Sequence, residues 1–256
     1  MTEGSGSEAV RETRAVIDFF ERYDYTSFWR ERGIEDAAQK EIIGGWVAPG
    51  GLSLELGGGF GRITKFLAPN FAGVVLLDLS GRNLGMARRY HPEALLAQAD
   101  VTDTPFRDST FDLVVMVRVA HLLPDPSATM RELLRIAKDG AIVIISIPNQ
   151  VMIKIFLRLG ELARLGRRRG SKQAFIPSIW PFGDRPYLFS PMAMFPPSFK
   201  LTARRGTGIF ESPIGRRLNR HRRLYLLDVA TSLFWMFKFE VFLRFRVEKE
   251  NANGTT

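Results

Sequence analysis

The sequence contains no cysteine. This absence excludes disulfide bonds, thiolate metal sites, iron–sulfur clusters and cysteine nucleophiles, so stability has to come from a buried core. It also suits a reducing compartment, and we expect a cytoplasmic protein without a metal site. Only three histidines are present, His91, His121 and His221, which leaves few side chains whose ordinary pKa lies near neutrality.

The sequence also lacks an uncharged apolar run of the roughly 20 residues that cross a bilayer. Its N-terminal segment carries several acidic side chains where a signal peptide would need an unbroken apolar stretch. We therefore expect neither a membrane-spanning helix nor an export signal. The composition, 45% hydrophobic and 25% charged, is that of an ordinary globular protein, which excludes fibrous and wholly disordered chains.

Charge is distributed unevenly along the 256 residues. Residues 1–150 hold 16 Lys and Arg against 20 Asp and Glu, a net charge of −4, whereas residues 151–256 hold 20 against 7, a net charge of +13. Two Arg-rich segments of this second part, 164–172 and 216–223, lie beside apolar helical stretches. Three interpretations stay open: helices at an anionic membrane surface, arginines that hold RNA phosphates, or apolar faces that pack on the core while arginines face water.

The spacing of apolar residues predicts an α/β fold. Between residues 9 and 47 it predicts two leading helices with a break at 23–27. From Leu52 short apolar runs alternate with helical segments, which is typical of a parallel sheet covered by helices on both faces. The predicted strands are 52–56, 74–77, 95–97, 111–117, 141–147, 199–202 and 241–247, and the predicted helices between them are 63–67, 84–90 and 130–137, with a helical insertion at 214–238.

The helix that ends near residue 137 has clear boundary signals. Asp125 is placed to cap it, and Pro126 fits its first turn. Lys138 suits its negative end, and Gly140 is expected to terminate it.

A glycine-rich loop follows the first predicted strand, in the segment Leu54-Glu55-Leu56-Gly57-Gly58-Gly59-Phe60-Gly61-Arg62. Glycines allow a tight turn and let backbone N–H groups approach a ligand. The spacing Gly57-x-Gly59-x-Gly61 differs from the G-x-G-x-x-G of dinucleotide-binding folds, since the sixth position is Arg62. This spacing argues against a nicotinamide oxidoreductase. No Gly-Lys-Ser/Thr follows the loop, so a P-loop is also absent.

Two acidic residues close the next two predicted strands. Asp78, 21 residues beyond Gly57, can accept hydrogen bonds from a ribose diol, and Asp100 ends the following strand. The carboxyl ends of parallel strands meet at one edge of the sheet, where open α/β folds bind nucleosides. We therefore expect the glycine loop and both acids to share one site.

Five segments in this order resemble the class I S-adenosylmethionine (SAM)-dependent methyltransferases, within them the broad group that acts on quinones, lipids and small molecules. The resemblance covers about residues 35–148, in segments 54–62, 76–80, 99–106, 111–115 and 134–141. It implies a Rossmann-like, doubly wound, mostly parallel seven-stranded sheet of order 3-2-1-4-5-7-6 with helical insertions. It also implies SAM as the cofactor and in-line transfer of its methyl group to a small-molecule or lipid-like acceptor.

The resemblance further implies a domain plan. One methyltransferase domain is expected over residues 9–250, with N-terminal helices and the cofactor-binding core over 9–148. Basic substrate-side insertions and the last strands follow over 149–250. The small polar ends, 1–8 and 251–256, are expected to be disordered tails.

Individual residues take roles from the resemblance. The loop glycines Gly57, Gly59 and Gly61 would lie against the methionine part of SAM. Asp78 would hold the ribose hydroxyls, while Asp100, with the backbone of Val101, would bind the adenine. Backbone near Val117 and Arg118 would meet the methionine amino group, and the neighbouring Glu55 and Leu79 complete the predicted cofactor set.

The acceptor side is less defined. Holding the acceptor at attack distance supplies much of the rate of such a displacement, so few side chains need take part. For a hydroxyl acceptor His121 is the candidate base, against a structural role at a helix start, and Arg118 is either an orienting group for an anionic acceptor or an ion-paired arginine. Cysteine-dependent cytosine methylation is excluded, and the motif of adenine amino methylation is missing after the fourth strand. The alternative is a non-enzymatic membrane- or RNA-binding adaptor on the same scaffold, and the oligomeric state stays open.

Overall fold

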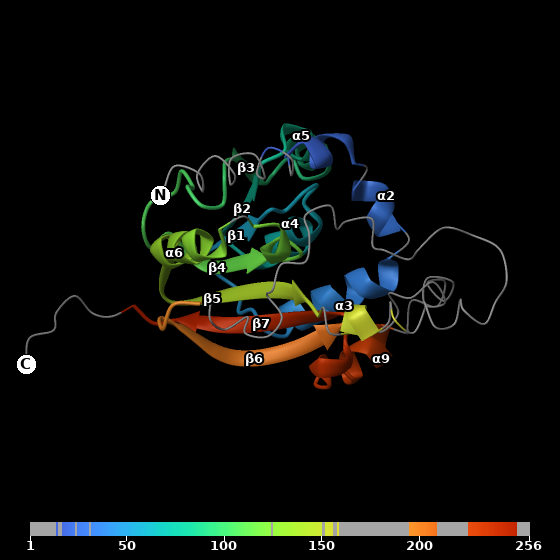
Figure 1. The fold of residues 1–256 in the computed structure, drawn as a ribbon. Helices are drawn as coiled ribbons and strands as arrows, with labels where there is room; N and C mark the ends of the chain where they lie inside the picture. Colours follow the sequence, from blue (N-terminus) through green and yellow to red (C-terminus); the bar gives the residue numbers. More distant parts are fainter. Residues whose placement is uncertain are drawn as a thin grey trace, which may run out of the picture.

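The computed structural model describes residues 14, 17–23, 25–30, 32–123, 125–149, 152–155, 158, 195–208 and 225–249. In this part of the chain a seven-stranded sheet of order β3-β2-β1-β4-β5-β7-β6 forms the centre of the molecule (Figure 1). Its strands are β1 (Leu52–Leu56), β2 (Gly73–Asp78), β3 (Leu95–Gln98), β4 (Phe111–Met116), β5 (Ala137–Pro148), β6 (Phe199–Thr207) and β7 (Glu240–Val247). Strands β1 to β5 pair in parallel and β7 pairs antiparallel with both β5 and β6. The predicted fold class and strand order are confirmed.

Helices precede the first strand, and others connect the strands. They are α2 (Tyr25–Arg30), α3 (Gly33–Gly44), α4 (Arg62–Leu67), α5 (Gly81–Tyr90), α6 (Pro126–Ile136) and α9 (Tyr225–Ala230), with 3₁₀ turns η1 (Ala68–Asn70), η2 (Ala120–Leu122) and η6 (Trp235–Phe237). Residues 17–22 are also helical. The second predicted leading helix is thus divided into α2 and α3, because Arg32 leaves the helical conformation at φ −121° before Gly33.

Helices cover both faces of the sheet. On one face Met130, Leu133 and Ile136 of α6 are buried against strand residues such as Val114. On the other face Ile43 of α3 packs with Ile63 and Leu67 of α4. The alternate strand residues Leu113, Val115 and Ile144 belong to the same cluster. Successive strand side chains point to opposite faces, so a strand buried on both sides is a continuous apolar run. This explains why Phe111-Asp112-Leu113-Val114-Val115-Met116 lacks alternation.

Strand β5 begins earlier than the sequence predicts. Helix α6 ends at Ile136, and Ala137 already pairs with Phe111 of β4. Gly140 has a left-handed φ of 75° where the β4–β5 register shifts, and Lys138 binds Asp112 at 2.8 Å. The predicted roles of Lys138 and Gly140 at a helix end are therefore wrong, since an irregular strand pairing takes up both residues.

The opposite end of α6 agrees with the sequence. The Asp125 side chain accepts a hydrogen bond from the Ala128 N–H at 2.9 Å, which confirms the predicted cap. Strands β6 and β7 confirm the two predicted C-terminal strands. Both tails, the two Arg-rich segments and His221 lie outside the described residues. None of the helices in the described ranges has the length and apolar character needed to cross a membrane.

Candidate active site

The glycine loop makes a left-handed turn at the carboxyl end of β1. Gly57, Gly59 and Gly61 have φ values of 64°, 58° and 86°, a region that favours glycine. The N–H groups of Gly57 and Gly58 both donate to the Leu77 carbonyl at the end of β2. A methyl group at position 57 would lie 2.4 Å from the Val119 side chain, so the loop has no room for a larger residue there.

Asp78 fastens this loop to the neighbouring strand. Its Oδ2 accepts the Gly59 N–H at 2.8 Å, and its Oδ1 accepts the Ser80 N–H at 2.9 Å and the Asn83 side-chain amide at 3.3 Å. Burial raises the pKa of the Asp78 carboxyl above its ordinary value, and the backbone hydrogen bonds oppose that rise. A carboxylate offers about four acceptor positions, so three bonds leave room for a ligand hydroxyl.

Asp100 lies just past the end of β3 and is half-buried. Its Oδ1 accepts hydrogen bonds from both the N–H and the hydroxyl of Thr102, each at 2.8 Å. These bonds fix the turn that carries the backbone of Val101 toward the same edge of the sheet.

A cavity of about 230 Å³ opens at this edge. The structure brings together around it seven of the ten predicted cofactor residues, namely Gly57, Gly59, Asp78, Leu79, Asp100, Val101 and Arg118. These seven come from the ends of β1, β2, β3 and β4, as expected for a doubly wound sheet.

The other three predicted cofactor residues lie just behind the cavity lining. Glu55 is buried and accepts hydrogen bonds from the N–H and hydroxyl of Thr64 in α4, and burial raises its pKa to about 7. Gly61 precedes α4, where a methyl group would lie 2.6 Å from the His91 ring. Val117 packs into the core between the sheet and α3. All three hold the loop and strand ends in place.

Side chains of the N-terminal helices complete the cavity wall. The sequence predicted N-terminal helices on the cofactor side but did not single out these side chains. Ile17, Phe20 and Tyr25 line it. Tyr25 lies over Gly59, stacks on Phe28 at 5.7 Å and meets further rings edge-on. Helical spacing alone could not separate these residues from ordinary core aromatics. The absence of a side chain at Gly59, opposite an aromatic-rich helix, is the one available signal.

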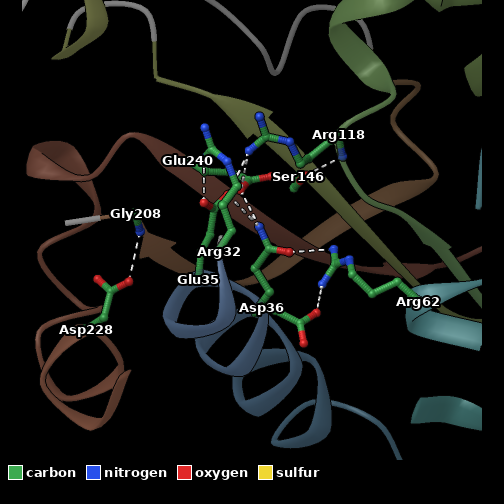
Figure 2. Close-up of polar contacts among 10 residues, drawn as sticks. Arg32, Glu35, Asp36, Arg62, Arg118, Ser146, Gly208, Asp228 and Glu240 are labelled. Atoms are coloured by element: carbon green, nitrogen blue, oxygen red, sulfur yellow. Dashed lines mark hydrogen bonds and ion pairs between the residues drawn. The ribbon is translucent and has the colours of Figure 1, made fainter. Parts of the chain in front are cut away.

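Arg118 connects the cavity to a buried charge network (Figure 2). It has a left-handed φ of 61°, and its N–H donates to the Ser146 hydroxyl at 2.8 Å. Its guanidinium lies 2.9 Å from Glu35 Oε1 of α3 and 3.5 Å from Glu240 Oε2 of β7. Arg118 is therefore ion-paired on one side and lines the cavity on the other.

The network continues along α3. Arg32 binds the second oxygen of Glu35 at 2.7 Å, and the Gln39 amide donates to Glu240 Oε2 at 2.7 Å. Gln39 also accepts a bond from Arg62, which lies 3.7 Å above the Trp29 ring. Burial, and next the Glu35 charge, raise the pKa of Glu240, while Arg118 opposes the rise. In the sequence the acids of α3 look like ordinary surface acids of an amphipathic helix, so this network was not predicted.

His121 lies in η2, immediately beyond β4, and is buried. It is not one of the residues that line the cavity. Burial, reinforced by the Arg118 charge, lowers its pKa to about 3, so the ring stays neutral at physiological pH. A base works best when its pKa lies near the working pH, so this ring is a weak base. Its role in catalysis stays a prediction.

The burial of His121 has a consequence for stability that can be measured. Between its ordinary pKa of 6.5 and its folded pKa of about 3, the unfolded chain binds the proton more readily than the folded one. The folded state should therefore lose stability as the pH falls through this window, by at most about 1.4 kcal/mol per pH unit. Urea unfolding at several pH values gives the free energy of unfolding as a function of pH. We expect this free energy to fall less steeply between pH 6 and 4 in the His121→Asn variant than in the wild type. An equally steep fall would contradict the assignment.

Comparison with known proteins agrees with this geometry. Residues 54–145 match the family described as "Methyltransferase domain". The demethylmenaquinone methyltransferase of Streptomyces avermitilis is 30% identical over 147 residues, which are 57% of this chain and 64% of that protein. The fatty-acid O-methyltransferase of Mycolicibacterium smegmatis is 35% identical over 108 residues, 41% of this chain and 37% of that protein. The chain thus spans less than two thirds of the length of these curated relatives.

A solved structure extends the likeness in fold. The SAM-dependent methyltransferase of Thermotoga maritima superposes with a TM-score of 0.58 at 16% identity and covers 91% of this chain and 99% of that one. Residues 54–145 therefore match a methyltransferase domain, the chain has the fold of class I methyltransferases, and the match implies SAM as the methyl donor. The resemblance recognised in the sequence is confirmed.

Proposed function

We propose that this chain is a SAM-dependent methyltransferase that acts on a small-molecule or lipid-like acceptor. The observation that carries the proposal is that the left-handed glycine turn, the Asp78 carboxylate and the Tyr25 ring all line the same cavity. The residues fit the donor: the left-handed glycines place no side chain between the loop backbone and the cavity, and Asp78 keeps an acceptor position for a hydroxyl.

Each side chain has a defined task in this proposal. Asp78 accepts the ribose hydroxyls, and Asp100 with the Val101 backbone binds the base. Arg118 and the aromatic wall bound the side from which an acceptor approaches, and they exclude water. Bound SAM supplies an electrophilic methyl group on a sulfonium. The protein then contributes mainly by positioning, which requires no covalent intermediate and no metal ion.

The class of acceptor is proposed from the relatives. Their names specify demethylmenaquinone, a fatty acid and a phytyl hydroquinone, all with extended apolar parts. The apolar side chains that line the cavity, among them Ile17, Phe20, Leu122 and Leu123, suit such an acceptor. The adaptor alternative gains nothing from these relatives, since all are named as methyltransferases. The cytoplasmic location stays a prediction.

Replacing Asp78 tests the donor site. In the Asp78→Ala variant we expect SAM affinity to fall by about 1–3 kcal/mol, or roughly 5- to 150-fold, because a buried hydrogen-bonding partner is removed. Titration calorimetry measures this directly. Asp103→Ala, an exposed acid near Asp100 that does not line the cavity, is the matched control and should bind as the wild type does. Unchanged affinity in Asp78→Ala would refute the assignment.

Activity is tested by labelling. Incubating the protein with methyl-labelled SAM and a lipid extract should transfer the label to an apolar acceptor that mass spectrometry identifies. A matched reaction with the Asp78→Ala variant should transfer less. Labelling only of polar acceptors, or none in the presence of demonstrated SAM binding, would contradict the proposed acceptor class.

A further inference from the structure

One short segment of the described chain carries an unusual amount of exposed apolar surface. Among the described residues, six of the nine exposed large apolar side chains lie between residues 226 and 237, in the 225–239 segment that comprises α9 and η6. Leu233, Phe234, Met236 and Phe237 are each between 62% and 67% exposed. A contiguous exposed apolar surface of this kind marks an interaction site more often than chance exposure does.

A buried ion pair holds this segment in shape. Lys238 Nζ lies 2.6 Å from Asp228 Oδ1 and 2.7 Å from the Thr231 hydroxyl, and both charged side chains are almost fully buried. The other Asp228 oxygen accepts the Gly208 N–H at 2.9 Å, which ties α9 to the end of β6 (Figure 2). The only acid and the only base of the 225–239 segment thus neutralise each other internally. Its outward surface is left apolar and uncharged.

The segment lies at the edge of the sheet where the cavity opens. It leads into β7, whose first residue Glu240 pairs with Pro148 at the carboxyl end of β5. Asn149 joins it to the next stretch of chain: its side-chain amide donates to the Met236 carbonyl, and its side-chain oxygen accepts the Met152 N–H. In Figure 1 α9 lies at the same end of the molecule as α3.

Basic side chains accompany the apolar surface. Lys154 and Arg158, in the stretch that begins next to Met236, are exposed, as is Ile155 between them. The second part of the chain, residues 151–256, has a net charge of +13. Aromatic and aliphatic residues beside lysine and arginine are typical of protein surfaces that insert shallowly into an anionic bilayer.

We infer that the 225–239 segment docks this protein on the surface of an anionic membrane, with Phe234 and Phe237 entering the headgroup region and Lys154 and Arg158 facing lipid phosphates. This places the cavity edge of the sheet on the membrane side. The inference does not depend on the proposed function, because lipid binding and SAM binding are measured separately on the same protein.

Vesicle sedimentation tests the inference. The full chain should bind vesicles of phosphatidylcholine with phosphatidylglycerol, bind phosphatidylcholine vesicles more weakly, and lose affinity for the former as salt rises. The Phe234→Ser/Phe237→Ser variant should bind anionic vesicles at least about tenfold more weakly than the wild type, because two large apolar groups no longer leave water on binding. Its SAM affinity should equal that of the wild type.

Two control variants separate the contributions. Leu95→Ser, an equally exposed apolar residue at the start of β3, should leave vesicle binding unchanged. Lys154→Gln/Arg158→Gln should reduce the preference for anionic vesicles and the dependence on salt.

Three outcomes would overturn the inference. They are no vesicle binding by the wild type, equal binding by the Phe234→Ser/Phe237→Ser variant, or a wild-type dimer that this variant converts to a monomer. The last outcome would assign the surface to a second copy of the chain.

Discussion

The Arg118→Ala variant is expected to unfold with a free energy about 3–5 kcal/mol lower than that of the wild type, the loss typical of removing one partner from a buried ion pair. Arg118 stands between Glu35 and Glu240, both buried, at 2.9 Å and 3.5 Å. Without the guanidinium the negative charges of Glu35 and Glu240 lose the positive charge between them. The pKa of Glu240, which Arg118 lowers, should therefore rise further. Urea unfolding at several pH values measures both effects.

Two comparisons isolate the cause. Arg246→Ala, an exposed arginine on the same strand β7, should change stability by no more than about 0.5 kcal/mol. Adding Glu240→Gln to Arg118→Ala should restore part of the lost stability, because one buried charge is removed. A loss in Arg118→Ala as small as that in Arg246→Ala would show that the network contributes little.

The Gly57→Ala variant is expected to lose SAM affinity by about 100-fold or more. An alanine there must adopt φ 64°, which costs about 1–2 kcal/mol, and its methyl group would lie 2.4 Å from the Val119 side chain. Val119 is β-branched, so its side chain has few alternative positions, and it lines the cavity. A shift of Val119 or of the loop that relieves the clash therefore narrows the donor site. Calorimetry with SAM gives the affinity, and circular dichroism monitors the fold.

Gly85→Ala provides the matched control. Gly85 is exposed within α5, and a methyl group there meets nothing within 4 Å. This variant should bind SAM normally and gain about 0.5–1 kcal/mol in stability, since alanine favours the helix. If Gly57→Ala bound SAM as tightly as Gly85→Ala does, the glycine turn would not be the donor site.

Much of the fold follows from the sequence because its signals are local. The apolar runs, the glycine turn and the Asp125 cap each depend on a few neighbouring residues, and the structure confirms the strand order that they and the resemblance predict. The error at Lys138 and Gly140 arose where two signals competed. A glycine after a helical pattern resembles a helix end, but the same glycine also permits the irregular pairing of β4 with β5.

The candidate site divides in the same way. Residues at strand ends, such as Asp78 and Asp100, are placed by topology and were predictable. The network of Glu35, Gln39 and Glu240 forms from positions about 200 residues apart, as in the bond from Gln39 to Glu240. No local pattern reports such a pairing, so sequence reasoning assigned Arg118 its place in the site without identifying its partners.

A crystal structure of the protein with S-adenosylhomocysteine, the demethylated form of the donor, tests the central claim most directly. The account predicts the nucleoside at the carboxyl edge of β1 to β3, with its ribose hydroxyls on Asp78, its adenine beside Asp100 and Val101, and its amino-acid part along the turn of Gly57 and Gly59. A ligand bound elsewhere, or the cavity occupied by the chain's own side chains while the ligand is demonstrably bound in solution, would contradict it.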